Sequence, residues 1–221
     1  MTSGYAVWRR RVQCAVGPVL LALLLMASPS LMAQQAAAKA KTVLVMGDSL
    51  SAAFGLSAPQ GWVALTAQRV QQQKPGWRVV NASISGETTA GGASRVAAEL
   101  KRHAPDVIVI ELGANDGLRG LPLAQSRANL DKIITTAQGA GARVLLIGMQ
   151  IPPNFGRDYT QGFQAMFKTL AQTHKTAFLP FLLEPIASDR ANFQDDNLHP
   201  VAAAQPKLRD HVWTQLGPLL K

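Results

Sequence analysis

Five short apolar segments alternate with longer amphipathic segments along this 221-residue chain, and this alternation limits the fold more than any other feature. Each apolar segment is rich in aliphatic or β-branched residues, as expected for parallel strands covered on both faces. The sequence predicts strands at 42–46, 78–82, 107–112, 144–149 and 177–181. It predicts helices at 61–73, 89–103, 123–139, 159–174 and 203–219. Strands and helices that alternate at this spacing indicate a three-layer α/β/α sandwich around a five-stranded parallel sheet.

The first 33 residues are typical of a secretory signal peptide. Arginines at positions 9–11 precede a leucine-rich apolar stretch at 15–26, and Ala33 ends a short segment suited to cleavage. The apolar stretch is too short to span a bilayer comfortably. We therefore expect a signal peptide at 1–33, a flexible lead-in at 34–41 and a single domain at 42–221. We also expect the mature protein to be periplasmic or secreted.

Charge and cysteine content exclude several functional classes. The net charge is +9, but the 22 lysines and arginines are scattered and no basic run alternates with aromatic residues. This pattern argues against nucleic-acid binding and leaves transient contact with a membrane surface as a weaker option. Cys14 is the only cysteine and lies in the predicted signal peptide, so the mature domain has no disulfide. We expect a monomer.

A candidate nucleophile follows the first predicted strand. Ser49 stands in the string 47–50 (Gly-Asp-Ser-Leu), at the carboxyl end of the strand, where open α/β sheets place their sites. An isolated Asp-Ser pair is equally typical of a helix N-cap. However, His199 lies in a predicted loop three residues after Asp196, and a serine nucleophile needs a base that a third group orients. Asp195 is an alternative orienting acid, although the spacing favours Asp196.

Two further turns offer groups that stabilise an oxyanion. Gly86 follows the second predicted strand, and its missing Cβ permits close approach of a backbone N–H. Asn115 follows the third strand and carries a neutral amide donor. The Ser49 N–H, expected at a helix start, is a third donor. The sequence contains no metal-binding histidine pair, no glycine-rich phosphate loop and no Gly-x-Ser-x-Gly elbow, so we expect no metal and no cofactor.

These strings together resemble the four blocks of the SGNH (GDSL) hydrolase family. The blocks lie at 47–50, 81–88, 113–116 and 196–200. The resemblance implies a flavodoxin-like sandwich, with Ser49 as nucleophile, His199 as base and Asp196 as orienting acid. It also implies an oxyanion hole built from Ser49, Gly86 and Asn115. Thioesterase members of the family often have glycine where Ala114 and Asn197 stand here, which puts the preferred acyl-chain length in doubt.

Apolar residues in the loops around these blocks suggest the substrate. The expected substrate-binding residues are Leu50, Leu118, Leu121, Ile151 and Phe155. An apolar lining suits an acyl ester or thioester, hydrolysed through an acyl-enzyme, although such residues also serve simply to pack loops. One alternative is a carbohydrate O-acetyl esterase, for which more exposed tryptophan and tyrosine are expected. Another is a non-catalytic lipid-binding protein on the same fold.

Overall fold

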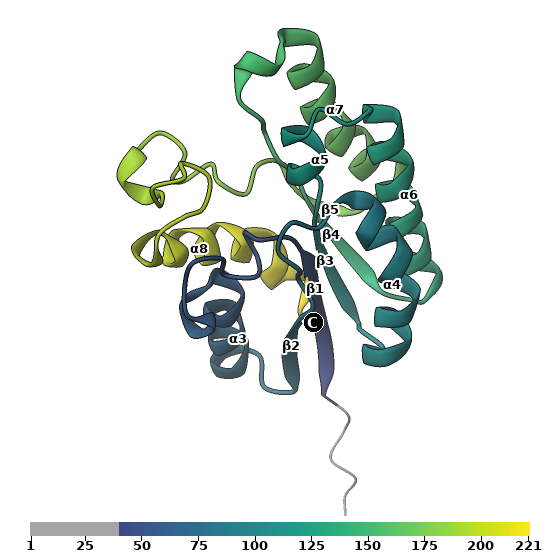
Figure 1. Cartoon of the computed structure of the whole chain (residues 1–221). Helices are drawn as coiled ribbons and strands as arrows, with labels where there is room; N and C mark the ends of the chain where they lie inside the picture. The colour runs from purple at the N-terminus through teal and green to yellow at the C-terminus, as the bar shows by residue number, and fades with distance from the viewer. Residues whose placement is uncertain (1–39) are drawn as a thin grey trace, which may run out of the picture. The chain divides into compact units, whose positions relative to one another are not determined.

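A parallel sheet forms the centre of the computed structural model, which describes residues 40–221 (Figure 1). The predicted signal peptide, and the lead-in up to residue 39, lie outside the described residues. The sheet order is β2-β1-β3-β4-β5, and every neighbouring pair is parallel. The strands are β1 (Lys41–Gly47), β2 (Trp77–Asn81), β3 (Val107–Glu111), β4 (Arg143–Ile147) and β5 (Ala177–Leu179). The predicted five-stranded α/β fold is confirmed.

Helices cover both faces of the sheet. Helices α3 (Trp62–Gln73) and α8 (Gln205–Leu216) pack on one face (Figure 1). The other face carries α4 (Thr89–His103), α6 (Leu123–Gly139) and α7 (Arg157–His174). The short 3-10 helices are η1 (Ala58–Gln60), η2 (Pro153–Phe155), η3 (Arg190–Asn192), η4 (Ala202–Ala204) and η5 (Gly217–Leu219).

Two differences from the predicted helices have local causes. The last predicted helix, 203–219, is α8 flanked by η4 and η5, because Pro206 lies in the first turn of α8 and Pro218 lies in η5. The short helix α5 (Ala114–Leu118) was not predicted, because five residues are too few to show a helical period.

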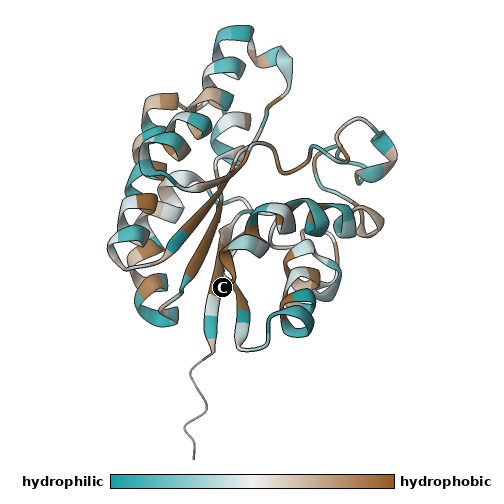
Figure 2. Cartoon of the chain, turned by 180° about the vertical axis from the view of Figure 1, so that it is seen from behind, coloured by the Kyte–Doolittle hydropathy of each residue, from teal (hydrophilic) through white to brown (hydrophobic). Residues whose placement is uncertain are grey.

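The hydrophobic core lies between the sheet and its two helical layers. The inner strands β1 and β3 are almost completely buried, as predicted for strands covered on both faces. Figure 2 shows the apolar residues gathered in these strands, while polar residues occupy the outer surfaces of the helices. Trp62 from α3 and Phe163 and Phe167 from α7 are the bulkiest fully buried side chains.

Strand register brings three distant turns to one edge of the sheet. Gly47 at the end of β1 pairs with Glu111 at the end of β3. On the other side of β1, the N–H of Ile84, which follows β2, donates to the Gly47 carbonyl over 3.0 Å. The chain winds in opposite directions on the two sides of β1, and such a switch point is where open sheets form a crevice for ligands.

Candidate active site

Ser49 lies in a tight turn directly after β1. The Ala52 N–H donates to the Asp48 carbonyl, and the Phe54 N–H donates to the Ser49 carbonyl. The predicted helix start at Ser49 is therefore wrong: these hydrogen bonds form an isolated turn, and no helix begins before η1. Gly47 is required for a steric reason: a Cβ there would lie 2.6 Å from Ser51 Oγ and 2.7 Å from Glu111 Oε2.

The structure brings Ser49, His199 and Asp196 together. Ser49 Oγ lies 2.7 Å from Nε2 of His199, and Nδ1 of the same ring lies 2.6 Å from Oδ2 of Asp196. An ionised carboxylate only accepts hydrogen bonds, so Nδ1 carries the proton and Nε2 is free to accept from the serine. This is the geometry that a serine nucleophile, its base and an orienting acid require.

The loop that carries Asp196 keeps this carboxylate ionised. Oδ1 of Asp196 accepts the backbone N–H groups of Leu198 and His199 at 2.9 and 3.0 Å. Slight desolvation raises the pKa of Asp196, but the hydrogen bonds from the His199 backbone and ring and from the Leu198 backbone lower it to about 2. Asp195 makes no hydrogen bond to the described residues, so the geometry selects Asp196 from the two adjacent acids. Between Asp196 and His199, Asn197 adopts a left-handed conformation (φ 59°), which asparagine tolerates.

Backbone donors stand unpaired beside this group. Within residues 40–221, neither the Ser49 N–H nor the Gly86 N–H has a hydrogen-bond acceptor. Gly86 has φ 79°, in the region that favours glycine. Asn115 Nδ2 differs from these two, because it already donates to Asp48 Oδ2 at 3.1 Å and to the Glu87 carbonyl at 3.0 Å. To serve as an oxyanion donor, Asn115 must exchange one of these two acceptors for the oxyanion.

Asp116 anchors the two turns that carry Gly86 and Asn115. It is buried, and its carboxylate accepts from the N–H and the hydroxyl of Thr89, at the start of α4, and from the hydroxyl of Ser126 in α6. These contacts join the turn after β2 to the turn after β3. This role was not predicted, because it depends on the strand register that brings the turns after β2 and β3 together.

A pair of buried acids lies behind the nucleophile. Glu111 is fully buried, and its Oε2 accepts from Ser51 Oγ at 2.6 Å, whereas its Oε1 has no partner among the described residues. Burial and the nearby Asp48 carboxylate raise the pKa of Glu111 well above its usual range. Burial also raises the pKa of Asp48 to about 6, despite hydrogen bonds from Leu50 and Asn115. A glutamate within an otherwise apolar strand was the sequence signal for this pair.

The other three histidines serve structural contacts. His103 pairs with Glu99 one turn earlier on α4, and His174 pairs with Asp131 of α6. The ring of His211 is hydrogen-bonded to the carbonyl of Phe181 at 3.0 Å. None of the three is hydrogen-bonded to Ser49, which leaves His199 as the histidine of the site.

An apolar cavity of about 460 Å³ opens beside Ser49 and His199. It reaches across the ends of β3, β4 and β5, and three of the predicted substrate-binding residues, Leu50, Leu118 and Ile151, line it. The apolar wall is completed by four residues that were not predicted to bind substrate: Met149, Phe181, Leu183 and Phe193. The last three lie in the segment after β5, which has no periodic pattern. The volume suits a small ligand.

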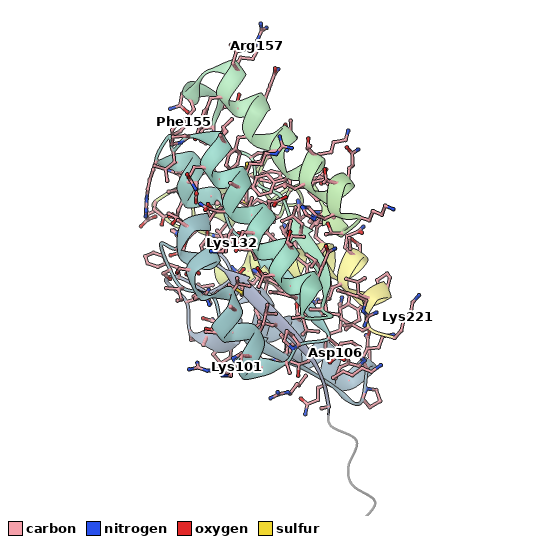
Figure 3. The ribbon with its side chains drawn as sticks, turned by 90° about the vertical axis from the view of Figure 1, so that its right-hand side faces the viewer. Lys101, Asp106, Lys132, Phe155, Arg157 and Lys221 are labelled. Carbon is pink, nitrogen blue, oxygen red and sulfur yellow. The ribbon has the colours of Figure 1, made fainter. Side chains whose placement is uncertain are left out.

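Leu121 and Phe155, which were also predicted to bind substrate, do not line this cavity. Leu121 lies between α5 and α6 and is 36% exposed, and its carbonyl accepts from the Tyr159 hydroxyl at 2.7 Å. The Phe155 ring stacks on Tyr159 with a centroid distance of 6.4 Å. Figure 3 shows Phe155 beside Arg157, at the outer end of α7. These residues pack the loops, an alternative that the sequence left open.

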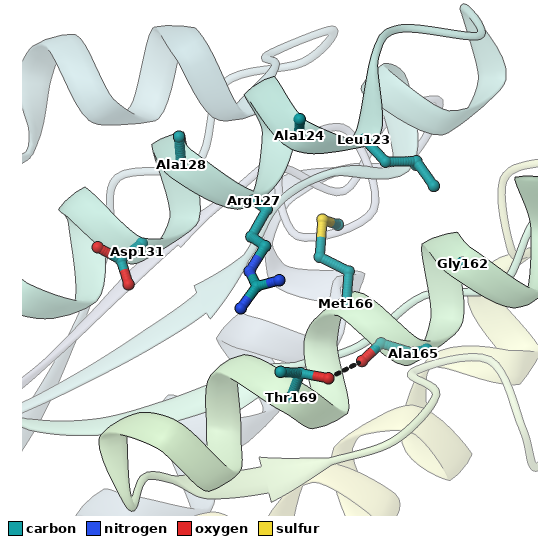
Figure 4. Close-up of a pocket in the computed structure, with 9 residues that line it drawn as sticks. All are labelled: Leu123, Ala124, Arg127, Ala128, Asp131, Gly162, Ala165, Met166 and Thr169. Atoms are coloured by element: carbon teal, nitrogen blue, oxygen red, sulfur yellow. Dashed lines mark hydrogen bonds between the residues drawn. The ribbon is translucent and has the colours of Figure 1, made fainter.

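A second groove, of about 480 Å³, lies between α6 and α7 and contains none of the predicted site residues. Figure 4 shows Arg127 and Met166 side by side in it, with Leu123 at one end. Its position on the outer helical layer separates it from the sheet edge. The Ser49–His199 contact belongs to the cavity at the sheet edge, not to this groove.

Neither a metal centre nor a membrane span is evident in the part of the chain that the structure describes. Residues 40–221 hold no group of three histidine, cysteine or acidic side chains able to bind a metal ion. No helix within these residues is both long and apolar enough to cross a membrane.

Comparison with known proteins agrees with this geometry. Residues 45–205, which include every residue of the Ser49–His199–Asp196 group, match the model of the GDSL-like lipase/acylhydrolase family. The chain belongs to this family. As a GDSL-like acylhydrolase, it is an enzyme that hydrolyses small-molecule esters.

Several relatives of this GDSL-like enzyme are known. It is 49% identical to esterase TesA of Pseudomonas aeruginosa over 190 residues, which cover 86% of this chain and 94% of that protein. It is 41% identical to thioesterase 1/protease 1/lysophospholipase L1 of Escherichia coli K12, over 83% of this chain and 87% of that protein. An arylesterase of Vibrio mimicus is 38% identical over 79% of this chain and 87% of its own length. The crystal structure of TesA superposes with a TM-score of 0.79 at 48% identity, covering 81% of this chain and 99% of that one.

Proposed function

We propose that this enzyme is a secreted serine esterase and thioesterase that hydrolyses acyl esters and thioesters through an acyl-enzyme intermediate. The observation that carries the proposal is the contact of Ser49 Oγ with His199 Nε2 at the mouth of an apolar cavity. Relatives named esterase, thioesterase and arylesterase support the same substrate range. No cofactor takes part in the proposed reaction.

In the first half-reaction, Ser49 Oγ attacks the substrate carbonyl while His199 Nε2 takes the hydroxyl proton. A positive charge develops on the His199 ring as it takes the proton, and the ionised carboxylate of Asp196, whose Oδ2 lies 2.6 Å from Nδ1, stabilises it. The carbonyl oxygen becomes an oxyanion that accepts from the free N–H groups of Ser49 and Gly86. In similar enzymes, removal of one such donor lowers kcat by about 10²–10³.

Collapse of the tetrahedral intermediate releases the alcohol or thiol half of the substrate. The imidazolium of His199 donates its Nε2 proton to an alkoxide leaving group, whereas a thiolate scarcely needs it. Water then enters, loses a proton to His199 and attacks the acyl carbonyl. The same oxyanion donors act again, and His199 returns the proton to Ser49 Oγ as the bond to the acyl group breaks and the carboxylic acid leaves.

The acyl chain is proposed to occupy the cavity across β3 to β5. Its walls are mostly apolar, and this favours an acyl chain over the carbohydrate that an O-acetyl esterase would bind. Secretion is supported by the signal-peptide pattern of residues 1–33. The N-terminus of the protein recovered from the periplasm or medium, read by mass spectrometry, should begin at Gln34.

One hydrolysis screen tests the proposed activity. Wild-type protein and its Ser49→Ala variant are assayed on p-nitrophenyl esters from acetyl to palmitoyl, on acyl-CoA and on a lysophospholipid. Turnover of medium-chain esters and acyl-CoA by the wild type alone supports the proposal. Equal rates for the two proteins would overturn it, and so would hydrolysis of an acetylated sugar, assayed alongside, without activity on the other substrates.

A further inference from the structure

Large apolar side chains exposed on this enzyme gather around the active site. Among residues 40–221, the large hydrophobic residues that are exposed are Phe54, Ile84, Leu121 and Leu198. All four lie in loops at the carboxyl edge of the sheet, although the described surface includes many other loops. Leu198 lines the apolar cavity and Leu121 belongs to the loop before α6. Phe54 and Ile84 lie outside the cavity and have no assigned role.

Phe54 is held against the proposed base. Its ring centroid lies 4.4 Å from that of His199, at an interplanar angle of 37°, and the side chain is still 48% exposed. Its backbone is fixed on both sides, because its N–H donates to the Ser49 carbonyl and its own carbonyl accepts from Gln194 Nε2 at 2.9 Å. The phenyl ring thus has a fixed position, with one part on the imidazole and the rest open to solvent.

Ile84 is fixed beside the proposed oxyanion donors. Its N–H donates to the Gly47 carbonyl at 3.0 Å, and its carbonyl accepts from the Glu87 N–H, which closes the turn that contains Gly86. Its side chain is 51% exposed. Ile84 is therefore a large, exposed aliphatic side chain two residues from the proposed donor Gly86, a position from which it can contact a ligand.

We propose that Phe54 and Ile84 form a binding subsite for the alcohol or thiol half of the substrate. The subsite suits an apolar group, such as an aryl ring, next to the bond that is cleaved. This inference rests on the proposed function, because it assumes that His199 protonates the leaving group.

The two halves of the substrate lie on opposite sides of Ser49 in this arrangement. Apart from residues 48–50 of the turn after β1, the cavity for the acyl chain is bounded by residues that follow β3, β4 and β5. Phe54, later in that turn, and Ile84, after the edge strand β2, do not line it. His199 must place its Nε2 proton on the departing atom, so the departing group passes along the imidazole. Phe54 covers that ring, and an aryl group there would contact the phenyl ring at favourable aromatic distances.

The test varies the leaving group while the acyl group stays constant. The substrates are p-nitrophenyl hexanoate and methyl hexanoate, assayed with wild type, Phe54→Ala and Ile84→Ser. We expect kcat/KM for the aryl ester to fall about tenfold in Phe54→Ala. For the methyl ester, the fold-decrease in kcat/KM should be at least threefold smaller than for the aryl ester. Leu121→Ala removes an exposed leucine at the same edge of the sheet and is the matched control. It should leave kcat/KM unchanged for both esters.

The acyl-enzyme step separates this subsite from mere support of His199. Deacylation no longer involves the leaving group, so its rate, measured after the p-nitrophenol burst, should stay within twofold of wild type in Phe54→Ala. Equal losses on both esters, together with slower deacylation or a shifted acid limb of the pH profile, would overturn the subsite and leave Phe54 as a support for His199. If Phe54→Ala does not fold, Phe54→Leu and Ile84→Ser must show the same selective loss. Failure of the wild type to exceed Ser49→Ala would instead refute the proposed function.

Discussion

Ser49 Oγ and His199 Nε2 lie 2.7 Å apart, although 150 residues of chain separate them. The strand register sets the position of the serine, because Gly47 pairs with Glu111 and the turn begins there. The histidine comes from an irregular loop, which the hydrogen bond from the Gln194 N–H to the His199 carbonyl closes upon itself. This contact makes Ser49 the hydroxyl that we expect to react, and variants of nearby residues serve as controls in the experiments below.

Ser49→Ala should abolish both ester hydrolysis and covalent labelling by a fluorophosphonate, because no other described hydroxyl is in contact with His199. The free energy of unfolding should change by no more than about 1.5 kcal/mol, the usual range for one hydrogen bond. Ser51→Ala is the control: it removes a hydroxyl two residues away that donates to Glu111, and labelling should persist. Labelling of the Ser49→Ala protein, detected by gel fluorescence, would disprove the assignment.

Asp196→Asn should lower kcat by orders of magnitude, about 10⁴ by analogy with the same change in a serine protease. An amide at this position would favour the tautomer with the proton on Nε2, which cannot accept from Ser49. Asp195→Asn should retain most of the activity, because Asp195 makes no contact with the imidazole. Steady-state kinetics of the two variants decides between them, and a greater loss in Asp195→Asn would reverse the assignment.

The pKa of Asp196, about 2, predicts part of the pH profile. Protonation of this carboxyl would break its contact with Nδ1, and that happens only as the pH falls towards 2. The acid limb of kcat/KM above pH 4 should therefore reflect groups other than Asp196. A titration of Asp196 by carboxyl-carbon NMR with a midpoint above 4 would contradict this.

Leu118→Ser should flatten the dependence of kcat/KM on acyl-chain length, because Leu118 lines the apolar cavity. Each buried methylene contributes about 0.8 kcal/mol, so wild type should gain tenfold or more between acetyl and hexanoyl esters. Leu121→Ser changes the same residue type three positions away, outside the cavity, and should keep the wild-type slope. The p-nitrophenyl ester series measures both, and a flat profile in Leu121→Ser alone would place the chain elsewhere.

Glu111→Gln should make stability less dependent on pH. The folded state raises the pKa of Glu111, so it binds a proton that the unfolded chain releases above pH about 4.5. Wild type therefore loses stability as pH rises above that value, until the pH exceeds the folded pKa. The neutral glutamine avoids this loss, so the Tm of the variant should fall less than that of wild type between pH 5 and pH 9.

Calorimetry at pH 5, 7 and 9 checks this expectation. Asp158→Asn is the control, because Asp158 is exposed and makes no ion pair with the described residues, so its neutralisation should leave the pH dependence unchanged. Parallel Tm curves for wild type and Glu111→Gln would show that Glu111 is ionised in the folded protein.

Local sequence was sufficient for the sheet and the long helices, and it indicated the three residues that the structure brings together at the candidate site. The apolar runs of β1 and β3 predicted buried parallel strands because burial on both faces leaves no room for alternation. Ser49, Asp196 and His199 were recognisable because each stands in a short string whose residue types have a chemical purpose.

The tertiary structure decided what depends on contacts between distant segments. The choice of Asp196 over Asp195 follows from which carboxylate the loop points at the imidazole. Part of the cavity wall, including Leu183 and Phe193, comes from the irregular segment after β5, where no period marks a residue as inward-facing. Glu111 acquired its raised pKa, and Phe54 its contact with His199, only when strand register and loop closure brought them to their partners. Composition and spacing carry no information on such pairings, because they are set by packing across the whole sheet.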